Sequence, residues 1–314
     1  HHLEELVTTM AQATNFGPKR LGVALARAHG VFLSPSTIRN ILRRHSIRCR
    51  KYRTGNGGTR YGVNLAAFRP LEFWQIDVKD IADQKALPPS AYASIFRERL
   101  PRYQFTACEV RTRIRFIAYA HELSFLSGCA FLLLLTFWLR SFGVQRQLLF
   151  QTDNGTEFGG LGNSRKRLLM QRYIFDPLGV TLLAIPPREK TVNTFVERSH
   201  RTDDEEFYAL NLGKTTTKHT FLSMAQEWIL TYNFRRPHFG RGMRGRTPME
   251  VLLSLQNDVH PALGAFPVLL LDRVLPHLKV LWDISGIPWD NSPKNKNRGL
   301  ANETLDQYIF EREQ

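Results

Sequence analysis

The chain has 314 residues, an ordinary apolar content of 43% and a formal net charge of +15 at pH 7, with a pI near 10.1. This length allows one sizeable hydrophobic core with one or two smaller domains. So basic a chain predicts a polyanionic partner, nucleic acid before all else. The three cysteines have no metal-ligand spacing and fit a reducing compartment. The apolar run Cys129–Leu139 is too short to cross a bilayer, so no membrane partner is expected.

The positive charge is concentrated near the front of the chain. No Asp or Glu occurs from Leu6 to Leu71, and the same stretch carries twelve basic residues. They are Lys19, Arg20, Arg27, Arg39, Arg43, Arg44, Arg48, Arg50, Lys51, Arg53, Arg60 and Arg69. A uniformly solvated surface would not be segregated in this way.

The front of the chain predicts three helices. Two of them cover about Leu3–Ala13 and Gly17–Ala28, and the third starts at Ser34 as N-cap with Pro35 in the first helical position. The third helix runs to about His45, with apolar residues on one side and arginines around the rest. This pattern predicts a helix-turn-helix unit whose last helix enters the major groove of DNA. The alternative is a small helical bundle with a solvated basic face.

We therefore assign residues 1–50 to a DNA-binding domain and residues 51–70 to a basic linker. The stretch Arg48–Gly58 has almost nothing to bury and is expected to follow phosphates, although a plain tether is the simpler alternative. The predicted DNA-binding residues are Ser36, Thr37, Arg39, Asn40, Arg43, Arg44, Arg48, Arg50, Lys51 and Arg53.

The middle of the chain predicts an α/β sheet covered by helices, assigned to residues 71–250. Strands are predicted at Phe73–Val78, Tyr103–Glu109 and Ile114–Ala120, followed by an apolar helix over 125–141 and a strand ending before Asp153. An acid interrupts the first strand at Asp77, and the returning strand ends in Asp-Asn-Gly. Asp-Asn-Gly is also a common turn, so Asp153 alone is weak evidence for a metal site. If the returning strand lies beside the first, Asp77 and Asp153 come together.

The following segment adds a basic insertion, a strand and two helices. The insertion covers Gly159–Arg172, and the strand covers Val180–Ile185. A long polar helix is expected from near Thr191 to Tyr208, and an amphipathic helix over about Thr220–Tyr232. By three- and four-residue spacing, one face of the long helix carries Asn193, Glu197, His200, Arg201 and Asp204. Three carboxylates from two strand ends and a helix can hold a pair of Mg²⁺ ions, which prefer oxygen ligands and activate phosphoryl transfer.

At this point the chain resembles the DDE transposases of bacterial insertion sequences, which share the retroviral-integrase catalytic core. The matching segments are GPKRLGVALARAHG…SPSTIRNILRRH, FWQIDVKDI, YQFTACEVRTRIRFIAYAHELS, QTDNGTEF, VNTFVERSHRTDDEEFY and YNFRRPH…GRTPMEV. They cover about Gly17 to Val251 in the family's order. The chain departs from the family at Lys190 and Thr194, where Pro and Gly are usual, and in the length of the insertion.

The resemblance implies an RNase H-like mixed sheet flanked by helices, with Asp77, Asp153 and Glu197 as catalytic metal ligands for two Mg²⁺ ions, or Mn²⁺ in their place. Asn154, Asn193 and Arg198 match supporting positions. It further implies a transposase that binds terminal inverted repeats of double-stranded DNA, cleaves them and joins the 3′-hydroxyl ends to target DNA. A homo-oligomer on DNA in the bacterial cytoplasm, at the nucleoid, is expected. Residues 251–314 have no predicted role.

Two other functions stay open. A protein with an inactive core that represses its own element is one, and the three intact acids argue against it. An RNase H-type nuclease for RNA–DNA hybrids is the other, and the predicted helix-turn-helix argues against it because this unit suits B-form duplex.

The third acid also has a rival. Glu189 has the spacing from Asp153 that many integrase cores use, but it directly follows Pro186-Pro187-Arg188. Glu197 is expected inside a helix, and metal ligands need rigid support. We therefore predict Glu197. Arg165, Lys166 and Arg167 are expected either to contact flanking DNA or to be solvated, and His200 is expected to be an ordinary helix-surface histidine.

Overall fold

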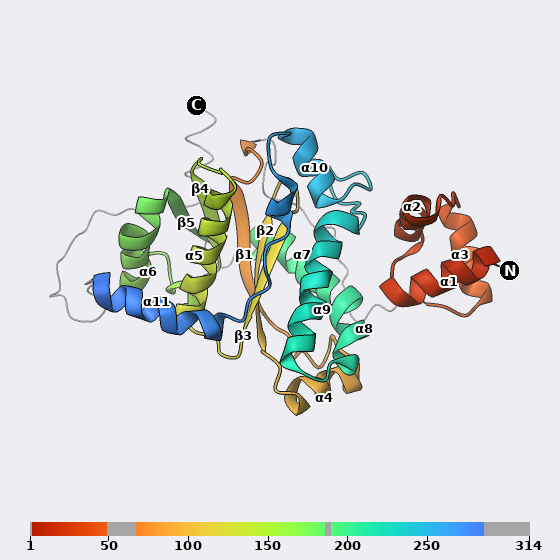
Figure 1. Cartoon of the computed structure of the whole chain (residues 1–314), viewed down its shortest axis with the longest axis horizontal. Coiled ribbons are helices and arrows are strands. Elements are labelled where there is room, and N and C mark those ends of the chain that lie inside the picture. The colour runs from red at the N-terminus through yellow and green to blue at the C-terminus, as the bar shows by residue number, and fades with distance from the viewer. Residues whose placement is uncertain (1, 49–66, 186–189, 286–314) are drawn as a thin grey trace.

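Five strands form one mixed sheet in the order β3-β2-β1-β4-β5 (Figure 1). The computed structural model describes residues 2–48, 67–185 and 190–285. The strands are β1 (Phe73–Asp80), β2 (Tyr103–Glu109), β3 (Arg115–Ala120), β4 (Leu148–Thr152) and β5 (Val180–Ala184). β2 runs antiparallel to both β1 and β3, whereas β4 is parallel to β1 and β5 is parallel to β4. With helices on both faces, this is the predicted RNase H-like arrangement, and the returning strand lies beside the first.

Helices account for most of the remaining described chain (Figure 1). They are α1 (His2–Thr14), α2 (Pro18–His29), α3 (Pro35–Arg44), α4 (Pro89–Arg97), α5 (Phe125–Ser141), α6 (Arg165–Met170), α7 (Thr194–Asp203), α8 (Ala209–Asn211), α9 (Lys218–Leu230), α10 (Pro248–Leu255) and α11 (Leu271–Ser285). Among these described helices, none is long and apolar enough to cross a membrane.

Strand alternation divides the core between the two faces of the sheet. On one face, Trp74, Ile76 and Phe150 pack in the same cluster as the buried side of α5. On the other face, Phe73 and Leu149 pack with residues of α7. The helix α7 is therefore seated over the central strand β1 and its neighbour β2, and Leu149 of β4 belongs to the same cluster.

Residues 251–285, the described part of the segment that had no predicted role, join the same core. The Phe266 ring stacks on Phe116 of β3 with centroids 5.0 Å apart, and Leu263 and Leu271 are fully buried. The helix α11 packs against α5 and β3. This part of the chain covers the sheet rather than forming a separate tail.

The long polar helix predicted from Thr191 to Tyr208 is present in three pieces. A 3-10 turn (Lys190–Asn193) precedes α7, and a π-helical turn (Asp204–Tyr208) follows it. A π turn commonly marks a functional segment within a helix. Here it carries three consecutive acidic residues, and Asp204 and Glu206 of these are buried.

The three-helix unit at the front has its own small core. Ile38, Ile41 and Leu42 of α3 are buried, as their spacing predicts, in a cluster with Val7 of α1 and Leu21 of α2. Ser34 caps α3 by accepting a hydrogen bond from the Thr37 backbone N–H at 3.1 Å. This unit has the helices expected of a helix-turn-helix, and its role in DNA recognition stays a prediction.

Candidate active site

The carboxyl ends of β1 and β4 bring two predicted acids to neighbouring positions. Ile76 pairs with Thr152 across the parallel strands, and Asp77 and Asp153 are the next residues of each chain segment. The turn after β4 is held by two hydrogen bonds. Asp153 Oδ1 accepts from the Gly155 backbone N–H at 3.0 Å, and Asn154 Nδ2 donates to the Ile185 carbonyl at 2.9 Å. The predicted supporting residue Asn154 therefore ties the turn to the end of β5.

Two buried glutamines position the start of α7 over these strands. Gln75 and Gln151 are paired across β1 and β4, and both are 0% exposed. Gln75 Oε1 accepts the Phe195 backbone N–H at 2.9 Å, and Gln151 Nε2 donates to the Val192 carbonyl at 3.2 Å. Because strand residues two apart share a face, each glutamine lies on the same face as the aspartate that follows it. The sheet thus fixes the height of Glu197, one turn further along the helix.

The third acid is close enough to the first two to influence protonation. Burial, and then the negative charge of Asp153, raise the pKa of Asp77 from its ordinary 3.8 to about 8, with smaller contributions from Glu197 and Glu157. A hydrogen bond from the Val78 backbone opposes this shift. Four carboxylates from β1, the β4 turn and α7 therefore share one electrostatic environment.

Glu157 and Arg167 are parts of this environment that the sequence did not reveal. Glu157 is 7% exposed, and burial together with the charge of Asp153 raises its pKa. Arg167, from the insertion, is 2% exposed and donates from Nη1 to Thr152 Oγ1 at 2.9 Å. Burial lowers the pKa of Arg167 to about 10, against the attraction of Asp153. The expectation that Arg167 is solvated or on a DNA-facing surface is wrong, since it packs beneath the end of β4.

His200 also departs from the expected helix-surface position. It is buried, and its Nδ1 atom lies 3.6 Å from Asp77 Oδ2, which is too long for a hydrogen bond. Burial and the nearby charges of Lys79 and Arg115 lower the pKa of His200 well below 6.5. A neutral imidazole therefore faces the acid on the central strand.

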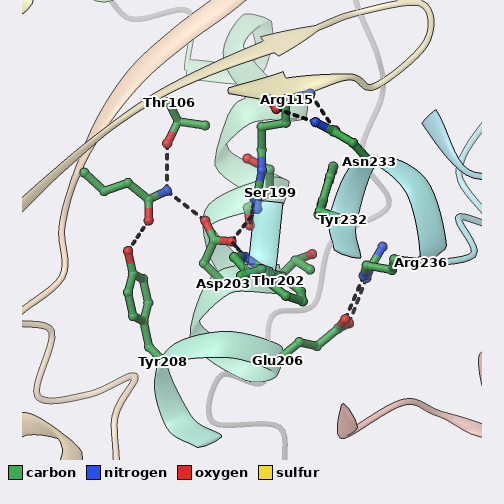
Figure 2. Close-up of polar contacts among 12 residues, drawn as sticks. Thr106, Arg115, Ser199, Thr202, Asp203, Glu206, Tyr208, Tyr232, Asn233 and Arg236 are labelled. Atoms are coloured by element: carbon green, nitrogen blue, oxygen red, sulfur yellow. Dashed lines mark hydrogen bonds and ion pairs between the residues drawn. The ribbon is translucent and has the colours of Figure 1, made fainter. Parts of the chain in front are cut away.

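Beyond Glu197, the continuation of α7 is anchored by three ion pairs, two of which, those of Asp203 and Glu206, are drawn in Figure 2. Asp203 pairs with Arg115 of β3 at 2.7 Å, and both side chains are 0% exposed. Asp203 also accepts from Trp228 Nε1 at 2.7 Å and from Gln104 Nε2 at 2.8 Å.

Within the π turn, Asp204 and Glu206 reach different partners. Asp204 accepts from Lys79 Nζ of β1 at 3.0 Å. Glu206 accepts from Arg236 Nε at 2.7 Å, a contact that Figure 2 also draws. Arg201, which was expected on the same helix face as Glu197, pairs with Glu205 at 2.9 Å. The helix is thus tied to β1, β3 and the segment after α9.

The donor chemistry of the site fits divalent magnesium. Asp77, Asp153, Glu197 and Glu157 offer only carboxylate oxygens, and their mutual repulsion is what a bound cation would offset. Within residues 2–48, 67–185 and 190–285, no three His, Cys, Asp or Glu side chains converge closely enough to hold an ion.

The remaining predicted site residues are not part of this cluster. Asn193 is 4% exposed and lies 3.5 Å from Gln151 Nε2, whereas Arg198 is exposed next to Glu197. The α3 positions are all exposed, as is the basic residue after the helix: Ser36, Thr37, Arg39, Asn40, Arg43, Arg44 and Arg48. Arg50, Lys51, Arg53 and the rival acid Glu189 lie outside the described residues.

A signal for the buried glutamines was present in the sequence. Gln75-Ile76-Asp77 and Gln151-Thr152-Asp153 repeat the same pattern at the ends of two strands. When two neighbouring strands each carry a buried amide two residues before an acid, the two amides indicate a segment that packs across both strands and hydrogen-bonds to them. For Arg167 no such signal exists, because a basic run gives no hint of which member turns inward.

Comparison with known proteins gives a partial family match. Residues 178–248, from the end of the loop before β5 to the start of α10, match the integrase core domain family. No curated protein matches the chain.

Two solved structures are similar at low identity. The simian T-cell lymphotropic virus intasome, solved in complex with the PP2A regulatory subunit B56 gamma, is 14% identical, with a TM-score of 0.40 over 78% of this chain and 72% of that one. The catalytic core domain of BIV integrase is 19% identical, with a TM-score of 0.35 over 60% of this chain and 97% of that one. The family match, which includes Glu197 and the whole of α7, identifies this part of the chain as similar to an integrase core domain.

Proposed function

We propose that this protein is a DDE-type DNA transposase of a bacterial insertion sequence, with Asp77, Asp153 and Glu197 as its catalytic acids. The single observation that carries the proposal is the register of β1 and β4, which brings Asp77 and Asp153 to neighbouring strand ends. Burial, and then the charge of Asp153, raise the pKa of Asp77 to about 8, and Glu197 adds to this shift. Acids are placed this unfavourably mainly at functional sites. The integrase core domain match over residues 178–248 supports the same class of chemistry.

In this proposal the acids hold two Mg²⁺ ions, which supply activation of water or a 3′-hydroxyl and stabilisation of the leaving oxygen. The protein's own contribution is positioning. The β1 and β4 ends present two carboxylates, and the glutamines below α7 set the third. The His200 ring lies beside Asp77, with its Nδ1 atom 3.6 Å from Asp77 Oδ2.

The remaining parts divide the task by region. Residues 1–50 recognise terminal inverted repeats, residues 51–70 follow phosphates, and residues 71–250 cleave DNA and join its 3′ ends to target DNA. Residues 251–314 are assigned no separate activity, and the described part of this segment packs on the core as far as α11. Two DNA ends must be handled together, so we propose a homo-oligomer on DNA, working at the nucleoid in the cytoplasm.

The testing experiment is incubation of the full chain with duplexes that carry the flanking repeats of its own locus and Mg²⁺. We expect nicking at the 3′ ends and joining to a target duplex. Asp77→Asn, Asp153→Asn and Glu197→Gln should each abolish both steps, while the matched control Glu189→Gln should cost little.

Cleavage by any of the three acid variants within about tenfold of wild type, a loss of about 1.4 kcal/mol, would exclude that residue as a ligand. Repeat binding without cleavage by the wild type would favour the alternative, a repressor derived from a transposase.

A further inference from the structure

A cavity of about 540 Å³ lies between the front three-helix unit and the core, next to the candidate active site. It is lined from three directions: by the turn between α1 and α2, by the outer side of α7, and by the segment from Arg236 to Met243. We call it the arginine pocket, because six of its lining residues are arginines. They are Arg20, Arg113, Arg198, Arg201, Arg236 and Arg241.

The charge of the arginine pocket is only partly neutralised by protein groups. Two acids, Glu205 and Glu206, line it against the six arginines. Glu206 is shared, since Arg20 Nη1 donates to its Oε1 at 2.8 Å and Arg236 Nε donates to its Oε2 at 2.7 Å. Arg201 is occupied by Glu205. The four formal positive charges in excess create a strong field for an anion.

Two arginines of the pocket remain available. Arg198 and Arg241 are exposed, and neither side chain has a hydrogen bond or ion pair with any residue in the described part of the chain. The crowding of positive charge is also visible at Arg20. Burial and then the charge of Arg236 lower its pKa to about 10, and Arg198 adds to the effect.

The position of the pocket indicates which anion it takes. Arg198 follows Glu197 directly on α7, so one wall of the pocket belongs to the helix that carries the third proposed acid. Its opposite wall belongs to the unit that carries α3, through Asn15, Gly17 and Arg20. Its volume falls within the range of roughly 300–1,000 Å³ that accepts ligands larger than a single ion.

We propose that the arginine pocket binds the sugar–phosphate backbone of DNA between the α3 unit and the candidate active site, with Arg198 and Arg241 as its phosphate contacts. This inference rests on the proposed function, because it assumes that DNA reaches both α3 and Glu197. It assigns to DNA binding a surface far along the chain from the basic residues of α3 and the linker.

The test measures binding of a random-sequence duplex of about 30 base pairs in EDTA, by fluorescence anisotropy over a range of salt concentrations. Each phosphate contact contributes about 0.9 to the slope of log K against log salt. The double variant Arg198→Ala/Arg241→Ala should lower the slope by about 1 to 2 and weaken binding about tenfold or more at low salt. Arg198→Lys/Arg241→Lys should recover most of the slope.

A matched control removes the same charge elsewhere. Arg97 and Arg102 are exposed arginines in surface ion pairs outside the pocket, so Arg97→Ala/Arg102→Ala should leave the slope within error. A change of opposite sign is expected from Glu205→Gln, which removes a competing negative charge but keeps an acceptor for Arg201. This variant should bind DNA more tightly.

The pocket assignment is overturned if the salt slope of the double variant is unchanged, or if the control variant loses as much slope as the double variant. It is also overturned if the wild type does not bind the duplex. Binding of free ATP that is lost in the double variant, without a change in DNA slope, would assign the pocket to a free nucleotide instead and overturn it too. Because this test measures no cleavage, it is independent of the test of the proposed function. If the wild type never cleaves DNA but the double variant lowers the salt slope, the pocket assignment stands and the catalytic proposal fails.

Discussion

At the scale of single residues, the position of Asp77 makes ionisation of its carboxyl group unfavourable. Only 20% of its side chain is exposed, and it lies among three other carboxylates. An acid whose pKa is higher in the folded chain than in the unfolded chain destabilises the fold as pH rises. The loss begins near its ordinary pKa of 3.8 and is complete above about 8, because the unfolded chain releases the proton first.

Asp77→Asn should therefore stabilise the metal-free protein, and more so at pH 8 than at pH 5. The difference in free energy of unfolding should grow by up to about 1.4 kcal/mol per pH unit. Thermal melting in EDTA measures it, with the exposed Asp258→Asn as control. Adding Mg²⁺ should raise the melting temperature of the wild type and have little effect on Asp77→Asn. If the difference in unfolding free energy between wild type and Asp77→Asn stays constant with pH, the pKa of Asp77 is not raised in the folded protein.

Arg167 is the second residue with an unusual position. Its guanidinium is buried beneath the β4 end, and its Nη2 atom has no hydrogen-bond partner within the residues that the structure describes. The nearby charge of Asp153 favours the protonated form of this arginine. It therefore provides a fixed positive charge behind the turn that presents Asp153.

Arg167→Met should reduce cleavage about tenfold or more, on the order of 1.4 kcal/mol in the barrier, with little change in DNA affinity. The reason is that Asp153 loses a fixed cation and Thr152 loses its donor. Single-turnover nicking rates measure the effect. Arg165→Met changes an exposed neighbour on the same helix and should cleave normally. Equal rates for both variants would limit Arg167 to a packing role.

At the scale of elements, α7 depends on the buried ion pair between Asp203 and Arg115. Removing one member leaves an uncompensated charge in the core, which typically costs about 3–5 kcal/mol. Arg115→Met and Asp203→Leu should each lower the free energy of unfolding by amounts of this order. The double variant should lose less than either single variant, since no charge is then left buried.

Urea unfolding of the four proteins forms the double-mutant cycle that tests this expectation. The exposed pair of Arg97 and Glu98 provides a comparison, whose coupling should be at most about 1 kcal/mol. Additive losses at Arg115 and Asp203 would show that the pair does not act as a unit, and that α7 is held by its other contacts.

The sequence predicted the elements with strong periodicity and missed those fixed by distant contacts. The strand Tyr103–Glu109 and the helix over 125–141 were placed within a residue, because alternation and a long apolar run are local signals. The placement of β4 beside β1 followed from topology. The helix α4 was missed, although its buried residues Ala91, Ser94 and Ile95 follow helical spacing.

The site itself was only partly predictable, for a similar reason. Asp77 and Asp153 were identified because an acid that ends a buried strand is conspicuous. Glu157 and Arg167 become significant only after the insertion folds back against β4. The π turn after α7 could not be anticipated either, because its conformation is accompanied by ion pairs with Lys79 and Arg236, which are distant in sequence.

At the scale of the whole molecule, the α3 unit is attached to the core by polar contacts rather than by a shared hydrophobic interior. Arg20 pairs with Glu206, and Arg27 pairs with Glu250 at 2.8 Å. The four apolar clusters of the described chain keep the residues of α1, α2 and α3 separate from those of the core. The contacts use α2 and the turn before it, so the outer side of α3 stays exposed.

Recognition of the terminal repeat should therefore depend on the exposed side of α3 in the intact chain. Arg39→Ala/Asn40→Ala removes two side chains that are exposed and away from the buried Ile38 and Ile41. Base contacts specify sequence, whereas phosphate contacts only position the protein. The double variant should lose the preference for repeat over random duplex, at about 1–3 kcal/mol for each base contact removed, and keep salt-sensitive nonspecific binding. Competition anisotropy with both duplexes measures the ratio, and a preference that survives in full would move recognition away from α3.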